Sequence, residues 1–142
     1  MNKQITYEPI VVGESLPTLV KQPTPRQLVM WAGASKEFSE MHYDKEFALS
    51  LGFPGRIVHG MLMASFLAQV VTDWMGELGT LKRIKTQNRK FILVNRRITN
   101  KGTVTKKFVK DGEYCVECEL WNEDEEGEKC VTAMVLVTLP ER

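Results

Sequence analysis

Hydrophobic residues recur at helical spacing in the first half of the chain and alternate with polar residues in the second half. Residues 24–34 open with Thr24 as a candidate N-cap and Pro25 at the first helical position. Leu28 and Trp31 then follow at helical spacing. This pattern predicts a short amphipathic helix.

Two further helices are expected before residue 76. Asp44 can cap a short helix over "KEFALSLG", which ends near Gly52. Residues 57–75 are apolar almost all round, which is typical of a helix buried on every side. No uninterrupted apolar run approaches the roughly 20 residues that a membrane helix needs, so we expect no membrane partner.

After Gly79 the pattern changes to that of strands. Residues 114–120 alternate strictly, and residues 130–139 are apolar on both faces, as in a covered central strand. Weaker alternation predicts strands near residues 80–94 and 103–110. Turn signals divide these strands at Lys101-Gly102, Asp111-Gly112 and Glu126-Gly127.

Helices followed by a run of antiparallel strands indicate the α+β class. With 142 residues we expect one domain, 1–142, in which an antiparallel sheet wraps around the long buried helix. Such a sheet leaves an edge open, and pairing with a second copy would close it.

Composition indicates an ordinary soluble protein, with 43% hydrophobic and 26% charged residues. Three cysteines do not fit a disulfide framework, and the N-terminus lacks the apolar core of a signal peptide. We therefore expect a cytoplasmic protein. Cys115 and Cys118 resemble a metal-binding pair, but in an alternating strand they point to opposite faces, so we expect no metal.

Charge is distributed unevenly although the net charge is only +1. Residues 82–110 hold 11 of the 19 Lys and Arg and no acid, whereas residues 111–128 hold 9 of the 18 Asp and Glu and no base. Neighbouring strands with complementary charges explain this pattern, and a basic strip that binds phosphates is the alternative. The adjacent acidic block argues against a nucleic-acid partner.

Candidate chemistry gathers between residues 37 and 61. Glu37 and His42 lie in an irregular segment between two predicted helices, and His59-Gly60 begins the buried helix. A carboxylate and a histidine can handle the protons of a water molecule, and free N–H groups at a helix start can bind an oxyanion. This set suits the addition of water to a double bond conjugated to a thioester.

The stretch "FSEMHYDKEFALSLGFPGRIVHGMLMASFLAQVV" resembles the MaoC-like (R)-specific enoyl-CoA hydratases and 3-hydroxyacyl-thioester dehydratases of the hotdog fold. The family pattern is approximately G-D-x-N-P-x-H-x-D, then Gly-Phe, then I-x-H-G-M at the start of the central helix. The resemblance covers residues 24–76 well. The matching residues are His42, Asp44, Ala48, Gly52, Phe53, Ile57, His59, Gly60 and Met61.

The chain also departs from the family pattern. Glu37 stands where the family has its catalytic aspartate, and Lys36 stands where it has glycine. Ser39-Glu40 replaces Asn-Pro, and the family's later P-V-x-x-G-D turn has no Gly-Asp here. These differences leave open a second interpretation, a non-catalytic hotdog subunit that shapes the acyl pocket of a heteromeric hydratase. A hotdog thioesterase is a third.

The resemblance implies a role for each candidate residue. Glu37 and His42 would bind the water as the catalytic pair, and the Gly60 N–H would bind the thioester oxygen. His59 is expected to be a core histidine with its hydrogen bonds satisfied, and Asp44 a helix cap. The alternative is that neither residue of the pair is catalytic. His42 would then be an ordinary loop histidine, and Glu37 a solvated carboxylate at the end of a helix.

Arg96 and Arg97 occupy the place of the missing turn. They would bind the 3′-phosphate of coenzyme A or a charged acyl group, unless they are simply exposed at the end of a strand. No cofactor is expected, since coenzyme A is part of the substrate. The expected partners are an acyl-CoA thioester and a second hotdog chain, in a homodimer or a heterodimer.

Overall fold

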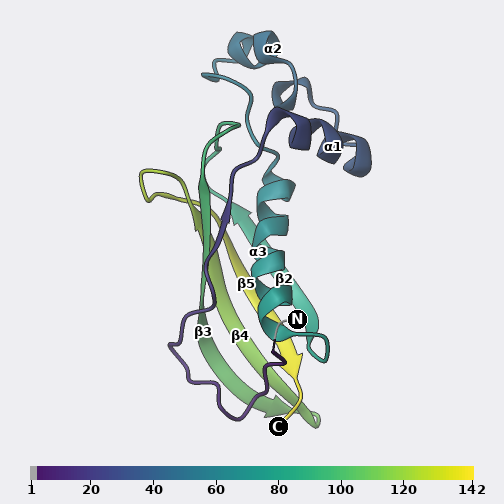
Figure 1. The fold of residues 1–142 in the computed structure, drawn as a ribbon, viewed down its shortest axis with the longest axis vertical. Helices are drawn as coiled ribbons and strands as arrows, with labels where there is room; N and C mark the ends of the chain where they lie inside the picture. Colours follow the sequence, from purple (N-terminus) through teal and green to yellow (C-terminus); the bar gives the residue numbers. More distant parts are fainter. Residues whose placement is uncertain (1–2) are drawn as a thin grey trace.

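One curved antiparallel sheet wraps around one long helix (Figure 1). The computed structural model describes residues 3–142. Five strands lie in the order β1-β3-β4-β5-β2, and this arrangement confirms the predicted α+β class with a central helix. The elements are β1 (Leu19–Lys21), α1 (Pro25–Ser35), the 3-10 helix η1 (Glu40–His42), α2 (Lys45–Ser50), α3 (Gly60–Met75), β2 (Thr80–Asn88), β3 (Ile98–Lys110), β4 (Glu113–Glu123) and β5 (Lys129–Leu139).

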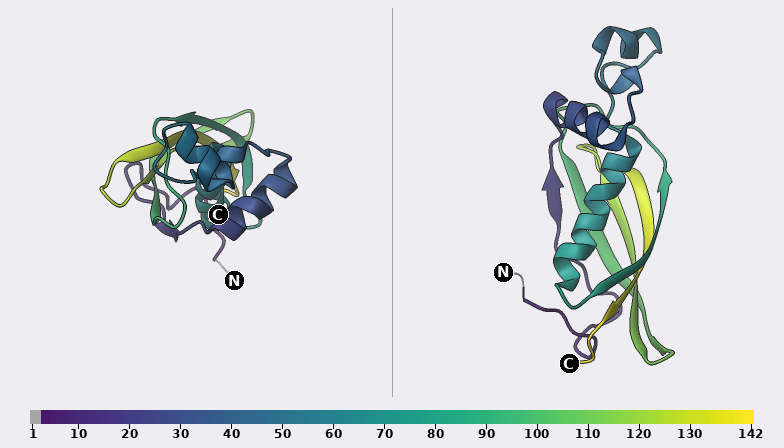
Figure 2. Two further views of the ribbon diagram at one scale, coloured as in Figure 1. Left: turned by 90° about the horizontal axis from the view of Figure 1, so that it is seen from above. Right: turned by 90° about the vertical axis from the view of Figure 1, so that its right-hand side faces the viewer.

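The short helices α1 and α2 gather at one end of the molecule, above the start of α3 (Figure 2). Both predicted N-caps are confirmed, because Thr24 Oγ1 accepts a hydrogen bond from Gln27 N at 3.2 Å and Asp44 Oδ1 accepts one from Phe47 N at 3.1 Å. These bonds satisfy N–H groups that the first helical turn leaves free. Helix α1 ends at Lys36, whose φ of 62° is left-handed.

The core lies between α3 and the concave face of the sheet. Helix α3 begins at Gly60, three residues later than predicted, because Ile57 and Val58 are extended and Val58 N donates to Ile92 O. Asn122 is a polar side chain that is fully buried in this core. Asn122 Nδ2 donates to Met63 O of α3 at 3.3 Å, and its Oδ1 accepts from a backbone N–H of β5.

The hairpin turns follow the glycine signals with one exception. Asp111 and Gly112 have φ of 53° and 76°, the two positive values of a type I′ turn, and join β3 to β4. The turn predicted at Lys101-Gly102 is wrong, because Gly102 lies inside β3. A Cβ there would lie 3.2 Å from Leu120 Cδ2, so this glycine serves close packing and not a turn.

The strand predicted near residues 80–94 is shorter than expected. β2 ends at Asn88, and residues 89–97 form a loop in which Asn95 takes a left-handed φ of 65°. Asparagine tolerates this conformation, so Asn95 can form a turn in this loop. β5 has a neighbouring strand on each side, as predicted for residues 130–139. The face of β5 that points away from α3 is not covered as expected, since Met134 on that face is 48% exposed.

The complementary charges fall on neighbouring strands as predicted. Lys106 pairs with Glu117 in the register of β3 and β4, and Lys101 Nζ lies 3.0 Å from Glu123 Oε2. Among residues 3–142, no helix combines the length and the apolar character needed to cross a membrane.

Candidate active site

The segment that carries Glu37 starts where α1 stops. The left-handed Lys36 turns the chain away from the helix axis, and Glu37 follows at once. The Glu37 carboxylate accepts hydrogen bonds from both the N–H and the hydroxyl of Ser39. These bonds lower the pKa of the exposed Glu37 carboxyl below its ordinary value, and the nearby His42 and His59 lower it further. Glu37 is therefore ionised at neutral pH.

His42 closes the short helix η1 and is buried, with 6% of its surface exposed. Its Nδ1 lies 2.8 Å from Ile57 O. A carbonyl oxygen can only accept, so Nδ1 carries the proton and the neutral ring has its lone pair on Nε2. The segment that leads into α3 thereby fixes both the ring orientation and the tautomer. Nε2 is free to accept a proton from a water molecule.

His59 lies directly beside His42. The two rings stack with centroids 3.8 Å apart and an interplanar angle of 23°. His59 is 2% exposed, and its Nε2 lies 3.3 Å from the backbone oxygen of Glu37. Burial and the neighbouring His42 lower the pKa of His59, which keeps that ring neutral. His59 thus links the segment of Glu37 to the ring of His42.

The expectation for His59 is confirmed in one respect and wrong in another. It is a core histidine, but its buried Nδ1 has no hydrogen-bond partner within residues 3–142. The stacked pair itself was missed, because a separation of 17 residues carries no signal of contact. Asp44 is the cap of α2, as expected.

Gly60 is the first residue of α3, and His59 is its N-cap. The first N–H groups of a helix have no acceptor inside the helix and lie at the positive end of its dipole. The structure therefore brings Glu37, His42 and the Gly60 N–H around one residue, His59. Together these groups offer a carboxylate, a proton acceptor and an oxyanion donor.

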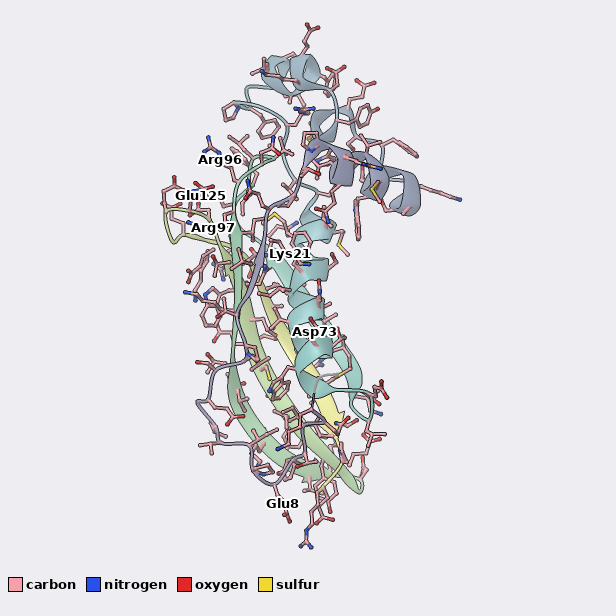
Figure 3. All side chains as sticks on the ribbon, viewed as in Figure 1. Glu8, Lys21, Asp73, Arg96, Arg97 and Glu125 are labelled. Atoms are coloured by element: carbon pink, nitrogen blue, oxygen red, sulfur yellow. The ribbon has the colours of Figure 1, made fainter. Side chains whose placement is uncertain are left out.

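Arg96 and Arg97 lie in the loop between β2 and β3 and are exposed. Figure 3 shows both beside Glu125, and Arg97 N donates to Glu125 Oε1 at 3.0 Å. Their loop packs against the segment before His59, since Val94 N donates to Arg56 O at 2.9 Å. The arginines are thus at the same end of the molecule as the histidines.

Neither a cluster of metal-binding side chains nor a disulfide is found among residues 3–142. Within residues 3–142, no three His, Cys, Asp or Glu side chains are grouped closely enough to hold a metal ion. The three cysteines are free and buried. Burial raises the pKa of the Cys118 thiol to about 12, which leaves it in the unreactive protonated form at neutral pH.

Comparison with known proteins identifies the family. The family described as "MaoC like domain" matches residues 8–125. This chain belongs to that family. The MaoC-like chain is 30% identical over 111 residues to an (R)-specific enoyl-CoA hydratase from Rhodospirillum rubrum, covering 72% of this chain and 75% of that protein. It is 31% identical over 74 residues to the beta subunit of a 3-oxo-4,17-pregnadiene-20-carboxyl-CoA hydratase from Mycobacterium tuberculosis, and these residues span 52% of this chain and 57% of that subunit.

Solved structures agree with the hotdog fold of this MaoC-like chain. An (R)-hydratase from A. caviae involved in PHA biosynthesis matches with a TM-score of 0.85 and 23% identity, over 94% of this chain and 99% of that one. The ChsH1-ChsH2 complex from Mycobacterium tuberculosis matches with a TM-score of 0.80 and 27% identity, over 91% of this chain and 98% of the matched chain.

Proposed function

We propose that this MaoC-like chain interconverts 2-enoyl and (R)-3-hydroxyacyl thioesters of coenzyme A by adding or removing water. One observation carries the proposal. His42 is buried, its Nδ1 proton is fixed on Ile57 O, its Nε2 makes no hydrogen bond within residues 3–142, and the ring lies near enough to the Glu37 carboxylate to lower the pKa of that carboxyl. The similarity to an (R)-specific enoyl-CoA hydratase supports the same reaction.

The water would be activated between Glu37 and His42. In hydration the water oxygen forms a bond to C3 of the enoyl group while His42 Nε2 takes one of its protons. Glu37 accepts a hydrogen bond from the other proton and so orients the attacking lone pair. The pair then delivers the proton that it took from the water to C2. The hydroxyl group on C3 and the new hydrogen on C2 together make up the water molecule that was added.

The electrons of the C2–C3 double bond move onto the thioester oxygen before C2 is protonated. The Gly60 N–H, at the start of α3, would donate to this oxygen as its negative charge develops. Interactions that are stronger in the transition state than in the bound substrate raise kcat, whereas interactions that are equally strong in both do not. The Gly60 N–H at the start of α3 would therefore stabilise the thioester oxygen most in the transition state, when that oxygen carries the most negative charge.

The test is loss of enoyl-thioester absorbance when the protein is mixed with crotonyl-CoA. We expect turnover by the natural chain and losses of roughly 10²-fold or more for His42→Ala and Glu37→Gln, as for general acid–base groups. Asp73→Asn, an exposed acid on α3 outside the proposed site, is the matched control and should retain activity. Turnover that survives His42→Ala would refute the mechanism. Release of free thiol in place of loss of the double bond would indicate a thioesterase.

A second candidate is a subunit that assists a catalytic hotdog partner. Two observations favour it: the similarity to a hydratase beta subunit and the exposed Glu37 at the place of the family aspartate. β2 ends the sheet order, so one of its edges has no partner strand among residues 3–142. We infer that this edge pairs with a second hotdog chain, and light scattering of the purified protein tests whether a like copy suffices. Absence of turnover with crotonyl-CoA and with longer enoyl-CoAs would favour the subunit.

Coenzyme A would be bound in part by Arg96 and Arg97. Their exposed guanidinium groups at the same end as the histidines support an interaction with the 3′-phosphate. Arg96→Ala should raise KM for crotonyl-CoA but leave KM for crotonyl-pantetheine unchanged. Equal effects on both substrates would remove the arginines from phosphate binding. The proposed reaction uses no cofactor beyond the coenzyme A of the substrate, and we place it in the cytoplasm.

A further inference from the structure

Asn88 is the last residue of β2, at the end of the molecule that holds the histidines. Side chains alternate along a strand, so Asn88 shares a face with Ile84, which packs against the core around α3. Gln87, by contrast, points to the outer face with Lys85. The sequence gives no hint of a role for Asn88, because it lies 28 residues after Gly60.

The Asn88 amide lies where a side chain of residue 60 would be. A Cβ built on Gly60 would lie 2.5 Å from Asn88 Nδ2, 3.2 Å from its Cγ and 3.3 Å from its Oδ1. Such a Cβ is at most about 3 Å from the Gly60 nitrogen, which leaves Asn88 Nδ2 within about 5.5 Å of that nitrogen. Two N–H donors that each lie about 2.9 Å from one oxygen can be about 5.8 Å apart. The two donors can therefore share one acceptor.

Two hydrogen-bond donors without partners lie close together here. Within residues 3–142, the Asn88 side chain makes no hydrogen bond, and Gly60 N is one of the free amides of the first turn of α3. The buried Nδ1 of His59 is also unpartnered, but His59 Nε2 faces the backbone oxygen of Glu37 and so carries the proton. That Nδ1 is therefore an acceptor, and the two donors, Asn88 Nδ2 and Gly60 N, are the groups suited to an acceptor oxygen of a ligand.

We propose that Asn88 Nδ2 donates a second hydrogen bond to the thioester carbonyl oxygen, beside the Gly60 N–H. This inference rests on the proposed hydratase function and deepens it. As the C2–C3 electrons move onto that oxygen, two donors stabilise the charge where one helix amide would act alone. It also explains why residue 60 is glycine, since any Cβ would displace the amide of Asn88.

The test compares Asn88→Ala and Asn88→Asp with Gln87→Ala, a neighbouring amide on the outer face of the same strand. Asn88→Ala should lower kcat for crotonyl-CoA hydration by roughly 10²-fold, as does removal of one oxyanion donor in other enzymes, with little change in KM. Asn88→Asp has the same shape but offers a negative charge in place of a donor, so its loss should be larger. Gln87→Ala should retain the natural rate.

A spectroscopic measurement separates a donor from a merely structural residue. Crotonyl-CoA labelled with ¹³C at its carbonyl is bound to His42→Ala, which should not turn it over, and the carbonyl stretching frequency is read by infrared difference. Hydrogen bonds to the oxygen lower this frequency. Asn88→Ala in the same background should raise it, and Gln87→Ala should leave it in place.

Each outcome decides the proposal. A reduced kcat with an unchanged carbonyl frequency, or an unchanged kcat in Asn88→Ala, overturns the role of Asn88 while the hydratase function stands. A natural chain that neither binds nor hydrates any enoyl-CoA overturns the proposed function and this inference with it. Reduced kcat together with the raised frequency in Asn88→Ala, but not in Gln87→Ala, supports it.

Discussion

Replacing Gly60 by alanine should lower the rate of catalysis while the protein stays folded. The added Cβ would lie 2.5 Å from Asn88 Nδ2, whereas ordinary contacts begin near 3.4 Å. The amide must therefore retreat by about 1 Å, and a misplacement of that size can cost on the order of 10²-fold in rate. We expect kcat for crotonyl-CoA to fall by about that factor.

The same change should hardly alter stability. The clashing atoms are at the far end of an exposed side chain, so they can move at a cost of roughly 1 kcal/mol. Alanine in place of a helical glycine gains a similar amount, roughly 0.5–1 kcal/mol. The free energy of unfolding of Gly60→Ala should therefore stay within about 1 kcal/mol of the natural value.

The assay is stopped-flow absorbance of crotonyl-CoA beside urea unfolding followed by circular dichroism. Gly55→Ala is the control, because its Cβ would meet only Leu93 Cδ2, at an ordinary 3.7 Å. The double variant Gly60→Ala/Asn88→Ala should be no worse than the poorer single variant, since both changes remove the same amide from its place. A Gly60→Ala protein with the natural kcat, or one that loses activity only because it unfolds, would refute this reasoning.

Three further changes test other parts of the structure. Ser39→Ala removes a hydrogen bond that lowers the pKa of Glu37, so an acid-side inflection of the kcat/KM profile that reports ionisation of Glu37 should move to higher pH, and an unmoved inflection would show that it does not report Glu37. Lys36→Gly relieves a left-handed φ of 62° and should raise the free energy of unfolding by about 1 kcal/mol in urea titrations. Asn122→Ala leaves Met63 O without its donor and should lower that free energy by about 2–3 kcal/mol; a loss below about 0.5 kcal/mol would show that this buried bond contributes little.

Local signals were sufficient for the elements that are stabilised locally. Thr24 and Asp44 cap helices whose first turns they complete, and a cap is recognisable from a few neighbouring residues. The turn at Asp111-Gly112 has the same local origin, since both residues take positive φ readily. The alternation of residues 114–120 predicted the strand β4, because alternating apolar residues are typical of a strand with one face toward the core.

Long-range contacts account for what the sequence did not predict. β1 has only three residues and exists because Leu19 and Lys21 pair with β3, about 80 residues away. Gly102 resembled a turn residue, but its lack of a side chain serves contact with Leu120 on the next strand. In the candidate site, motif spacing located His42 and Gly60, whereas the contact of Asn88 with Gly60 depends on how the sheet curves around α3.

The stacked histidines limit how much positive charge this end of the molecule can carry. Two charged rings with centroids 3.8 Å apart would repel each other by about 4 kcal/mol at the effective dielectric constant usual in proteins. Burial and the neighbouring His42 lower the pKa of His59, which keeps that ring neutral. His42 therefore stacks on an uncharged ring, and a positive charge that it gains during the proposed reaction would not be opposed by a second one.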